Sequence, residues 1–520
     1  MPRMKHVFPL FFLLAHICPI FATATWHHPA GYAGIARLFP IQRSSPVLNH
    51  AQALDLLLET AYHTTIEQRE VTTTVPLGLA LRYLPGFQPK HDIIEDNTVL
   101  VADTWFMKEL GDAEFVYKTI TRTGRLVLLR LLCDPAPTSA TPLLRQQYIQ
   151  RLIHDDTLYR TLEDILKEVR LTERLLYHVL RIIDVHQKTG LAQRLIKSPQ
   201  KTALIYAYFS RRFLEFFLTA LPAATHTLEK ATNRLKALCS KDTTPDLEKQ
   251  CLRTLTVAKD AYNSFIHLLT KAIHPDSTLG RKQELMLCAH LMNSAARLIP
   301  ELLDPLVLIA HVDAYMACAK IMRAAHQEQQ SYCFVHFITD TQRPMLQGTH
   351  LHFASQYIKV KEITLGSPKQ TSAFISGLSP RKNSYVAYSI LLCCVMGQSM
   401  GIAPAFRFMH TPFHKLYSFL QGPSMSALPP YNVLIPRLHQ AVMHAPSASG
   451  GVFAIAPAFF EATYPEKAPE EECITQALAC ANEPAILSAF FSTQEHAEAL
   501  PDALKSSIQS ITFASTHKHH

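Results

Sequence analysis

The spacing of hydrophobic residues changes along this 520-residue chain, and the change predicts two kinds of architecture. From residue 97 to 330, apolar residues recur every three or four positions, which is typical of α-helices that bury one stripe. One such stripe consists of Leu158, Leu162, Ile165, Leu166 and Val169. From 331 to 505, short apolar runs alternate with helical patterns. We therefore expect an α plus α/β fold, with a long-helix body followed by an α/β body.

Polar residues mark the ends of the helices predicted around this stripe. Asp155, Asp156 or Thr157 can cap its helix, because their side chains accept hydrogen bonds from the first free backbone amides. A second helix is predicted to end at Lys188-Thr189-Gly190. The stripe of that helix consists of Leu175, Leu176, Val179, Ile182 and Ile183. A polar break at Lys241 to Pro245 separates two further long helices.

Residues 1–24 have the three-part layout of a secretory signal peptide. Arg3 and Lys5 precede an almost wholly apolar run from Val7 to Ile20, and Ala22-Thr23-Ala24 supplies a small-residue cleavage site. The apolar run is short for a membrane-spanning helix. We expect export to the periplasm; the alternative is a cytoplasmic protein with an amphipathic or buried N-terminal helix. Residues 25–96 are predicted to be irregular, and 506–520 to form a flexible tail.

The segment from Ile375 to Pro404 has the layout of a nucleotide-binding loop without its lysine. An apolar run meets Gly377, a polar turn follows, and a long helix is expected from Tyr385 to Met400. A working loop reads G-x-x-x-x-G-K-[ST], in which backbone amides and the lysine bind phosphates and the hydroxyl binds Mg²⁺. Counted from Gly377, the three closing positions hold Lys382, Asn383 and Ser384. The candidate nucleotide-binding residues are Gly377, Ser379, Lys382 and Ser384.

Segments on both sides of this loop resemble the MutS family of DNA mismatch-repair ATPases. The turn Gly401 to Ala405 is similar to the family's glycine and VPA turn, and Val312 to Ala319 is similar to its "lDaLlslA" helix. The segments before the loop that occupy family positions are Arg343 to Leu346 and Val360 to Leu365. The residues that match the start of its core domain are Thr121, Gly124, Arg125, Leu126, Arg145 and Gln146. The resemblance implies a core and lever domain at 97–330 with a shortened DNA clamp, and an ATPase domain at 331–505.

The resemblance also implies where catalytic groups would stand, and those groups are missing here. The family's metal-binding and catalytic carboxylates end an apolar strand, where this chain has Ala456 and Pro457. Gln494 replaces the histidine of a later strand, and Ala427 to Asn432 replaces a serine loop. Neutral side chains cannot hold Mg²⁺ or polarise water. We expect a pseudo-ATPase with no catalytic residue, no metal ligand and no cofactor, in which ATP and Mg²⁺ bind only if the family site is retained.

Three functions are compatible with these features. The first is an exported MutS-like scaffold, with an unidentified envelope protein as partner and a homodimer like that of the family. The second is a MutS-type mismatch-repair protein that binds DNA and ATP; the formal charge of +8 is too dispersed to decide this. The third is an enzyme with a new site in the old nucleotide cleft, near Ser379, Lys382, Ser384 and Glu461.

The cysteines and histidines do not follow a zinc-binding pattern. None of the eleven cysteines is in CxxC spacing. Cys239 can pair with Cys251, and Cys473 with Cys480, while buried free thiols are the alternative. His410 and His414 have the spacing of a helical metal pair, but Pro412 interrupts it.

Overall fold

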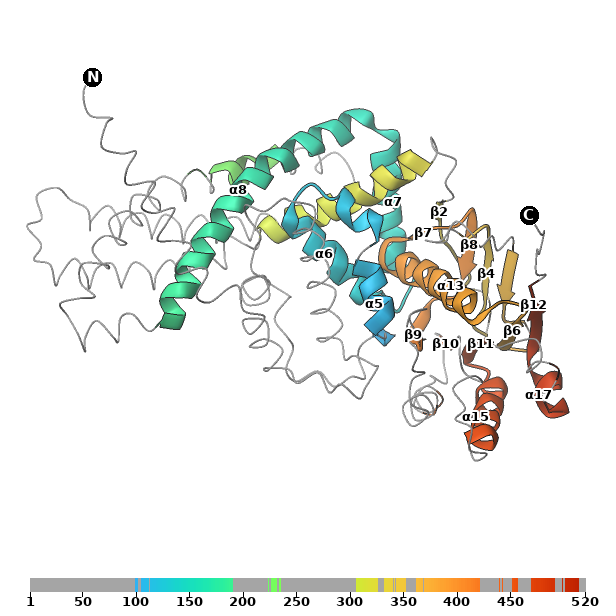
Figure 1. The fold of residues 1–520 in the computed structure, drawn as a ribbon. Coiled ribbons are helices and arrows are strands. Elements are labelled where there is room, and N and C mark those ends of the chain that lie inside the picture. Colours follow the sequence, from blue (N-terminus) through green and yellow to red (C-terminus); the bar gives the residue numbers. More distant parts are fainter. Residues whose placement is uncertain are drawn as a thin grey trace, which may run out of the picture. The chain divides into compact units, whose positions relative to one another are not determined.

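In the computed structural model, a group of helices is followed along the chain by the strands of two main β-sheets (Figure 1). The structure describes residues 99–101, 104–111, 113–189, 223, 226–231, 233–234, 305–325, 332–339, 341, 343–351, 362–367, 369–420, 439, 442, 451–456, 469–491, 498 and 501–513. The predictions that lie outside these residues concern 1–24, 25–96, Lys241 to Pro245, the Cys239–Cys251 pair, Ala427 to Asn432, Pro457, Glu461, Gln494 and 514–520.

The helical body follows the predicted apolar stripes. It includes α5 (Thr104–Gly111), the 3-10 helix η2 (Glu114–Lys118), α6 (Arg122–Cys133), α7 (Ala140–His154), α8 (Asp156–Thr189) and the helix Pro305–Ala325. Of the helices in the described part of the chain, Pro305–Ala325 alone is long and apolar enough to cross a membrane. However, 78% of its most apolar window is buried inside the protein, as expected for a core helix.

The two helices predicted between residues 155 and 190 are one helix. α8 runs without interruption from Asp156 to Thr189. The prediction of two helices is wrong, because no glycine or proline separates the two stripes. The predicted N-terminal cap is confirmed, because Asp155 Oδ1 accepts a hydrogen bond from the Leu158 amide at 2.8 Å. The predicted stop at Lys188-Thr189-Gly190 reaches beyond the described residues, of which Thr189 is the last in α8.

The larger sheet is parallel throughout its described pairings. Across the sheet its strands are β1 (Leu100–Val101), β9 (Phe413–Ser418), β10 (Gly451–Ala456), β11 (Ile486–Phe491), β6 (Ser372–Ser376) and β12 (Gln509–Thr512). Every residue of β10 and β11 is buried, as expected for parallel strands that are covered on both faces. The strand predicted to begin at Gly451 is confirmed.

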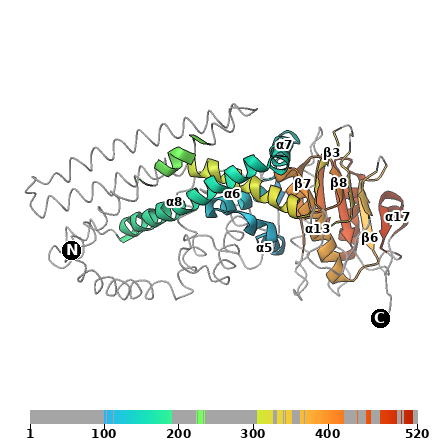
Figure 2. The same ribbon diagram turned by 90° about the horizontal axis from the view of Figure 1, so that it is seen from above.

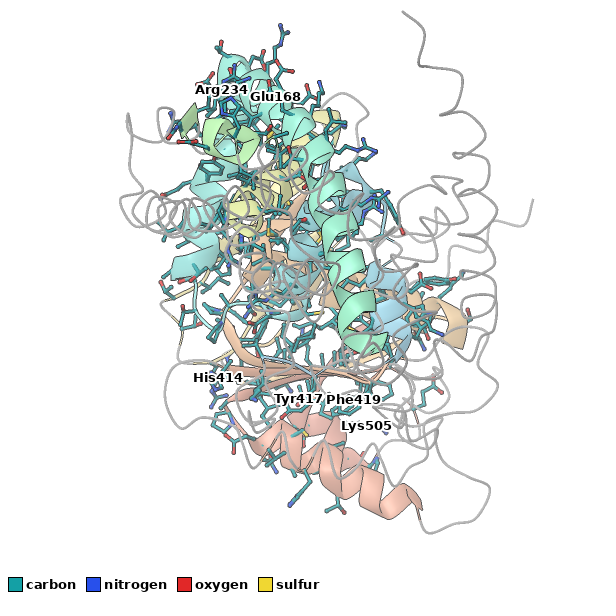
Figure 3. The ribbon with its side chains drawn as sticks, turned by 90° about the vertical axis from the view of Figure 1, so that its left-hand side faces the viewer. Glu168, Arg234, His414, Tyr417, Phe419 and Lys505 are labelled. Carbon is teal, nitrogen blue, oxygen red and sulfur yellow. The ribbon has the colours of Figure 1, made fainter. Side chains whose placement is uncertain are left out.

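Helices cover both faces of this sheet, because successive strand side chains point to opposite sides. Phe453 belongs to a core shared with α13 (Pro380–Met400), whereas Tyr417 and Phe419 belong to a second core with α15 (Pro469–Asn482). Figure 3 shows these two rings on the α15 side of the sheet, where they stack with centroids 6.4 Å apart. The small helix α17 (Asp502–Ser507) contacts α15 on that side. The strand β12 follows it, so the flexible tail predicted at 506–520 is wrong over 506–512.

A smaller sheet and a short ribbon complete the α/β body. The four-stranded sheet has the order β3 (His336–Phe337), β8 (Arg407–His410), β4 (Leu346–Thr349) and β5 (Glu362–Leu365). β2 (Cys333–Phe334) pairs antiparallel with β7 (Ile402–Ala403). The strand expected before the nucleotide-type loop, Val360 to Leu365, corresponds to β5 over its last four residues.

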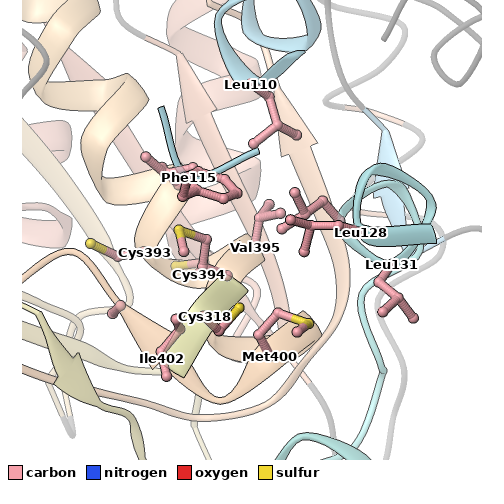
Figure 4. Packing of buried hydrophobic residues seen from close by; sticks show 14 of the residues in the cluster. Leu110, Phe115, Leu128, Leu131, Cys318, Cys393, Cys394, Val395, Met400 and Ile402 are labelled. Atoms are coloured by element: carbon pink, nitrogen blue, oxygen red, sulfur yellow. The ribbon is translucent and has the colours of Figure 1, made fainter. Parts of the chain in front are cut away.

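α13 joins the helical body to the sheets. It contacts α6 and α7 on one side and β7 and β10 on another, and Figure 2 shows it between the helices and the strands. Every residue from Val386 to Met400 is buried. In the part of the core drawn in Figure 4, Cys394 and Val395 lie in one cluster with Phe115 and Leu128 of the helical body.

The buried cysteines of the described residues are free thiols. Cys480 is one of them, so the predicted Cys473–Cys480 pair is wrong. Both residues belong to α15, where seven residues at about 1.5 Å each separate the Cα atoms by roughly 10 Å. A disulfide cannot bridge Cα atoms more than about 7 Å apart. Burial raises the pKa of the Cys480 thiol to about 12, so this thiol remains protonated at neutral pH.

Candidate functional site

The larger sheet has a topological switch point between β6 and β11. These strands are parallel neighbours, paired from Ser372 and Ser488 to Ile375 and Phe491. The chain leaves β6 through α13 on one face, and it passes from β11 to β12 through α17 on the other face. In open α/β sheets, ligands bind in the crevice outside the carboxyl ends of such strands. The candidate site is therefore the loop after β6 together with the neighbouring strand ends.

A three-residue loop, Gly377 to Ser379, connects β6 to α13. The predicted order of strand, loop and helix is confirmed, but the predicted helix start at Tyr385 is wrong. The helix begins at Pro380, because proline has a fixed φ suited to the first helical position and has no amide to satisfy there. The Asn383 amide donates to the Ser379 carbonyl at 2.9 Å. The Ser379 side chain makes no capping hydrogen bond, and a phosphate loop of the usual length is absent here.

Gly377 has a packing role that the sequence did not indicate. Its φ of +90° lies in the region that favours glycine, and a Cβ atom there would collide with the carbonyl oxygen of Phe513. The Phe513 amide donates to the Ser376 carbonyl at 3.0 Å, so the chain after β12 runs directly past the loop. Gly377 is needed for this close approach of two backbones, whereas the prediction assigned it to a phosphate.

The three residues after the loop lie in the first turns of α13, and their exposure differs. Lys382 is exposed, and Ser384 is buried with 7% of its surface exposed. Asn383, which the loop pattern places at the lysine position, is fully buried, and neither its Nδ2 nor its Oδ1 has a hydrogen-bond partner. An unpaired buried polar group costs about 1–3 kcal/mol. The loop therefore brings Gly377 and Ser379 together but places Lys382 on an exposed side of the helix.

The neighbouring strands end in uncharged residues. β10 ends at Ala456, which is 2% exposed, and β11 ends at Phe491, which is fully buried. Ala456 is the last described residue of the strand for which the sequence predicted the loss of a carboxylate. Mg²⁺ sites require oxygen ligands such as carboxylates. In the described part of the chain, no group of three or more metal-ligating side chains comes together.

A buried carboxylate connects two segments that the sequence singled out separately. Asp313, in the helix Pro305–Ala325, accepts hydrogen bonds from the Ile120 amide at 2.9 Å and from the amide and hydroxyl of Thr121 at 2.7 Å each. Thr121 caps α6, because its Oγ1 accepts from the Gly124 amide at 2.9 Å. A Cβ atom at Gly124 would collide with the Asp313 carboxylate. Desolvation raises the pKa of Asp313 to about 6.

Glu173 closes the same helix end from α8. Its carboxylate accepts from the Arg122 amide at 3.0 Å and from the amide and hydroxyl of Thr123. Burial raises the pKa of Glu173, partly offset by these hydrogen bonds. Glu173 was not among the residues predicted from the sequence. The available signal was its position, because Val169, Glu173 and Leu176 share the i, i+4, i+7 spacing of a buried face.

A second pair of separately identified segments also meets. Arg145 Nη1 donates to the Ser399 carbonyl, and Gln146 Nε2 donates to the Val335 carbonyl at 3.3 Å. Gly401 ends α13 with a φ of +76°, and the Pro142 carbonyl and the Gln146 side chain leave no room for a Cβ atom there. The start of α7 is thereby packed against the end of α13.

His410 and His414 lie on strands and not on one helix. His410 is fully buried at the end of β8, where it stacks on Phe413 with ring centroids 5.3 Å apart. Its Nδ1 donates to the Thr411 carbonyl at 2.7 Å, and its Nε2 has no partner. Desolvation lowers the pKa of His410 to about 4, so it is a neutral core side chain. His414 is exposed on β9.

The described side chains of the candidate site are uncharged. The loop after β6 offers Ser379 and backbone groups, Asn383 is buried beneath it, and Ala456 and Phe491 end the adjacent strands. These four side chains carry no charge that could bind a phosphate or a metal ion. No family model and no curated protein matches this chain in the comparisons made with known proteins.

Proposed function

We propose that this chain is a MutS-like scaffold or binding protein whose nucleotide cleft no longer supports ATP hydrolysis. The proposal rests mainly on the close approach of the Phe513 backbone to Gly377. The Phe513 backbone occupies the space beside the shortened loop. A phosphate cradle needs free backbone amides and a lysine directed at the β- and γ-phosphates. Here the lysine position holds the buried Asn383, and Lys382 is exposed.

Loss of hydrolysis is supported separately by the strand ends. Phosphoryl transfer proceeds through positioning and through neutralisation of charge by Mg²⁺ and cationic groups. Ala456 offers no ligand to a metal, because its methyl side chain has no donor atom. The loop thus has no lysine to bind the phosphates, and Ala456 provides no carboxylate to bind Mg²⁺.

Descent from a MutS-like ancestor draws its support from the contacts between motifs. Asp313 of the "lDaLlslA"-like helix binds Thr121 of the core-domain motif, although 192 residues separate them. In the same way Arg145 contacts Ser399, beside the glycine turn at Gly401. Motifs of a common ancestral core are expected to pack against one another, whereas chance matches would be scattered over the fold.

Without nucleotide turnover, we propose that the chain acts through its surfaces outside the cytoplasm, as a homodimer with an envelope protein as partner. The signal-peptide layout of residues 1–24 supports this location. Cell fractionation should recover the wild-type chain in the periplasm. Leu13→Arg, which breaks the apolar run, should retain it in the cytoplasm. Recovery of both chains in the cytoplasm would reject export.

The deciding experiment is a titration of the purified chain with a fluorescent ATP analogue, with and without Mg²⁺. We expect no saturable binding, and Lys382→Ala should behave like the wild type because that side chain is exposed. Saturable Mg²⁺-dependent binding below about 100 μM, roughly 5.5 kcal/mol, would overturn the proposal. Tight DNA binding that weakens steeply with salt would then favour mismatch repair, because phosphate contacts release counterions.

A further inference from the structure

Three helices that are distant in sequence meet at the N-terminus of α6. Asp313 comes from the helix Pro305–Ala325 and Glu173 from α8, and both side chains are fully buried. Between them they accept hydrogen bonds from four consecutive backbone amides, those of residues 120 to 123. The free amides that begin a helix are normally satisfied by a cap or by water. Here they are satisfied by side chains of the two other helices.

The charge at this point is larger than the helix end can balance. A helix N-terminus carries about half a positive charge, which offsets part of one carboxylate but not two. Arg122 of α6 and Tyr159 of α8 also act electrostatically on the pair. Arg122 favours the ionised form of Glu173, whereas Tyr159 is uncharged at neutral pH. Desolvation is the main cause of the raised pKa of Asp313, and the like charge of Glu173 adds to it, so the pair is expected to hold one proton in acid.

We propose that Asp313, Glu173 and the N-terminus of α6 form a proton-controlled joint that is closed while the pair holds one proton and loosens when that proton is released. The second negative charge repels the first in a site without water access, so the two carboxylates separate and the amides of residues 120 to 123 lose their acceptors. The raised pKa of Asp313, about 6, places this release just below neutral pH.

The joint can move a large element. α8 continues from Glu173 to Thr189, which is about 24 Å of helix at 1.5 Å per residue. Loosening at Glu173 therefore changes how firmly this long arm is held to α6 and to the helix Pro305–Ala325. The consequence is regulatory: acidic surroundings favour a rigid helical body, and neutral or alkaline surroundings favour a looser one.

Hydrogen exchange of the full chain at pH 5 and pH 8 tests the joint. After correction for intrinsic exchange, the amides of residues 120 to 123 should lose at least about ten-fold protection at pH 8 in the wild type. Asp313→Asn and Glu173→Gln should show equal protection at both values, because one carboxylate alone fits the helix end. Glu168→Gln, an exposed position on α8, should keep the wild-type response. Unchanged wild-type protection, or a full response in both joint variants, would overturn the proposal.

A second measurement needs no variant and covers the case in which the variants fail to fold. Carbon-13 NMR of labelled aspartate and glutamate in the wild-type chain should reveal one carboxyl group with a titration midpoint between about pH 5 and 7, against an ordinary value near 4. That midpoint should coincide with the loss of protection at residues 120 to 123. Titration of every carboxyl group below pH 5 would refute a shared proton.

Discussion

Gln398 and Phe413 exchange two hydrogen bonds, as if the glutamine side chain were the backbone of a neighbouring strand. Gln398 Nε2 donates to the Phe413 carbonyl at 2.8 Å, and the Phe413 amide donates to Gln398 Oε1 at 3.0 Å. The same Nε2 also donates to the Ala136 carbonyl at 2.7 Å. One fully buried side chain therefore holds the end of α13 to the start of β9 and to the connection between α6 and α7.

Replacing this glutamine should be costly. In Gln398→Leu, the two buried backbone groups of Phe413 and the half-buried Ala136 carbonyl lose their partner, and we expect the free energy of unfolding to fall by about 3 kcal/mol. Urea denaturation measures the change, provided that the slope with denaturant stays constant. Gln147→Leu is the matched control, because Gln147 is exposed on α7 and its replacement should change stability by less than about 0.5 kcal/mol. Equal losses in the two variants would contradict the role of Gln398.

Gly377→Ala tests the interpretation of the loop. Alanine at a φ of +90° is strained by about 1–2 kcal/mol, and its Cβ also meets the Phe513 carbonyl, so we expect a total loss of about 2–4 kcal/mol. In a chain that ends at Thr512, the collision is absent and only the strain should remain. The measurement is the loss of unfolding free energy caused by Gly377→Ala, in the full chain and in the chain that ends at Thr512. The same cost in both would mean that Phe513 does not constrain Gly377.

The elements predicted well are those with strong local signals. The strand at Gly451 was predictable because a glycine pair precedes an uninterrupted apolar run, and the end of α13 because Gly401 follows a long apolar helix. The start of α13 was missed because the nucleotide-loop template outweighed the cap and proline signal of Ser379-Pro380. The break expected inside α8 followed from treating two stripes as two helices.

Protonation of His410 should destabilise the protein in acid. Its folded pKa of about 4 lies below the ordinary value near 6.5, so the unfolded chain binds the proton more readily between these values. Stability contributed by neutral His410 is complete above pH 6.5 and is lost as the pH falls through 4. From pH 7 to pH 4 we expect a loss of about 3 kcal/mol from this group.

The measurement is the difference in unfolding free energy between the wild type and His410→Phe at a series of pH values. Asp313 contributes in the opposite direction, because its raised pKa makes stability fall as the pH rises from 3.8 to about 6. Both chains contain Asp313, so its contribution cancels when one unfolding free energy is subtracted from the other. His414→Phe is the control, because His414 is exposed, and its difference curve should be flat. A flat curve for His410→Phe would show that the imidazole accepts a proton without cost.

The candidate site was predictable only in part, for a physical reason. Gly377 and Ser379 could be placed after a strand because the spacing is local. The approach of Phe513 to Gly377 depends on the pairing of β12 with β6. Glu173 and Asp313 meet at the start of α6 because two helices that are distant in sequence pack against it. Such contacts are set by tertiary structure, and a single sequence carries little record of them.

Asn383→Lys distinguishes a closed cleft from a dormant phosphate loop. In a dormant loop the substitution restores the missing cation, and Mg²⁺-dependent nucleotide binding should appear. In the structure, position 383 is fully buried, and an ammonium group there has no carboxylate among the residues described around the loop. We expect no nucleotide binding and a loss of several kcal/mol in unfolding free energy, because an unpaired buried charge is expensive. Asn383→Leu should instead leave stability unchanged or raise it by about 1 kcal/mol, since it removes an amide whose atoms have no hydrogen-bond partner. A stable Asn383→Lys chain that binds ATP would mean that the cleft can open, and that its loss of chemistry rests on side chains alone.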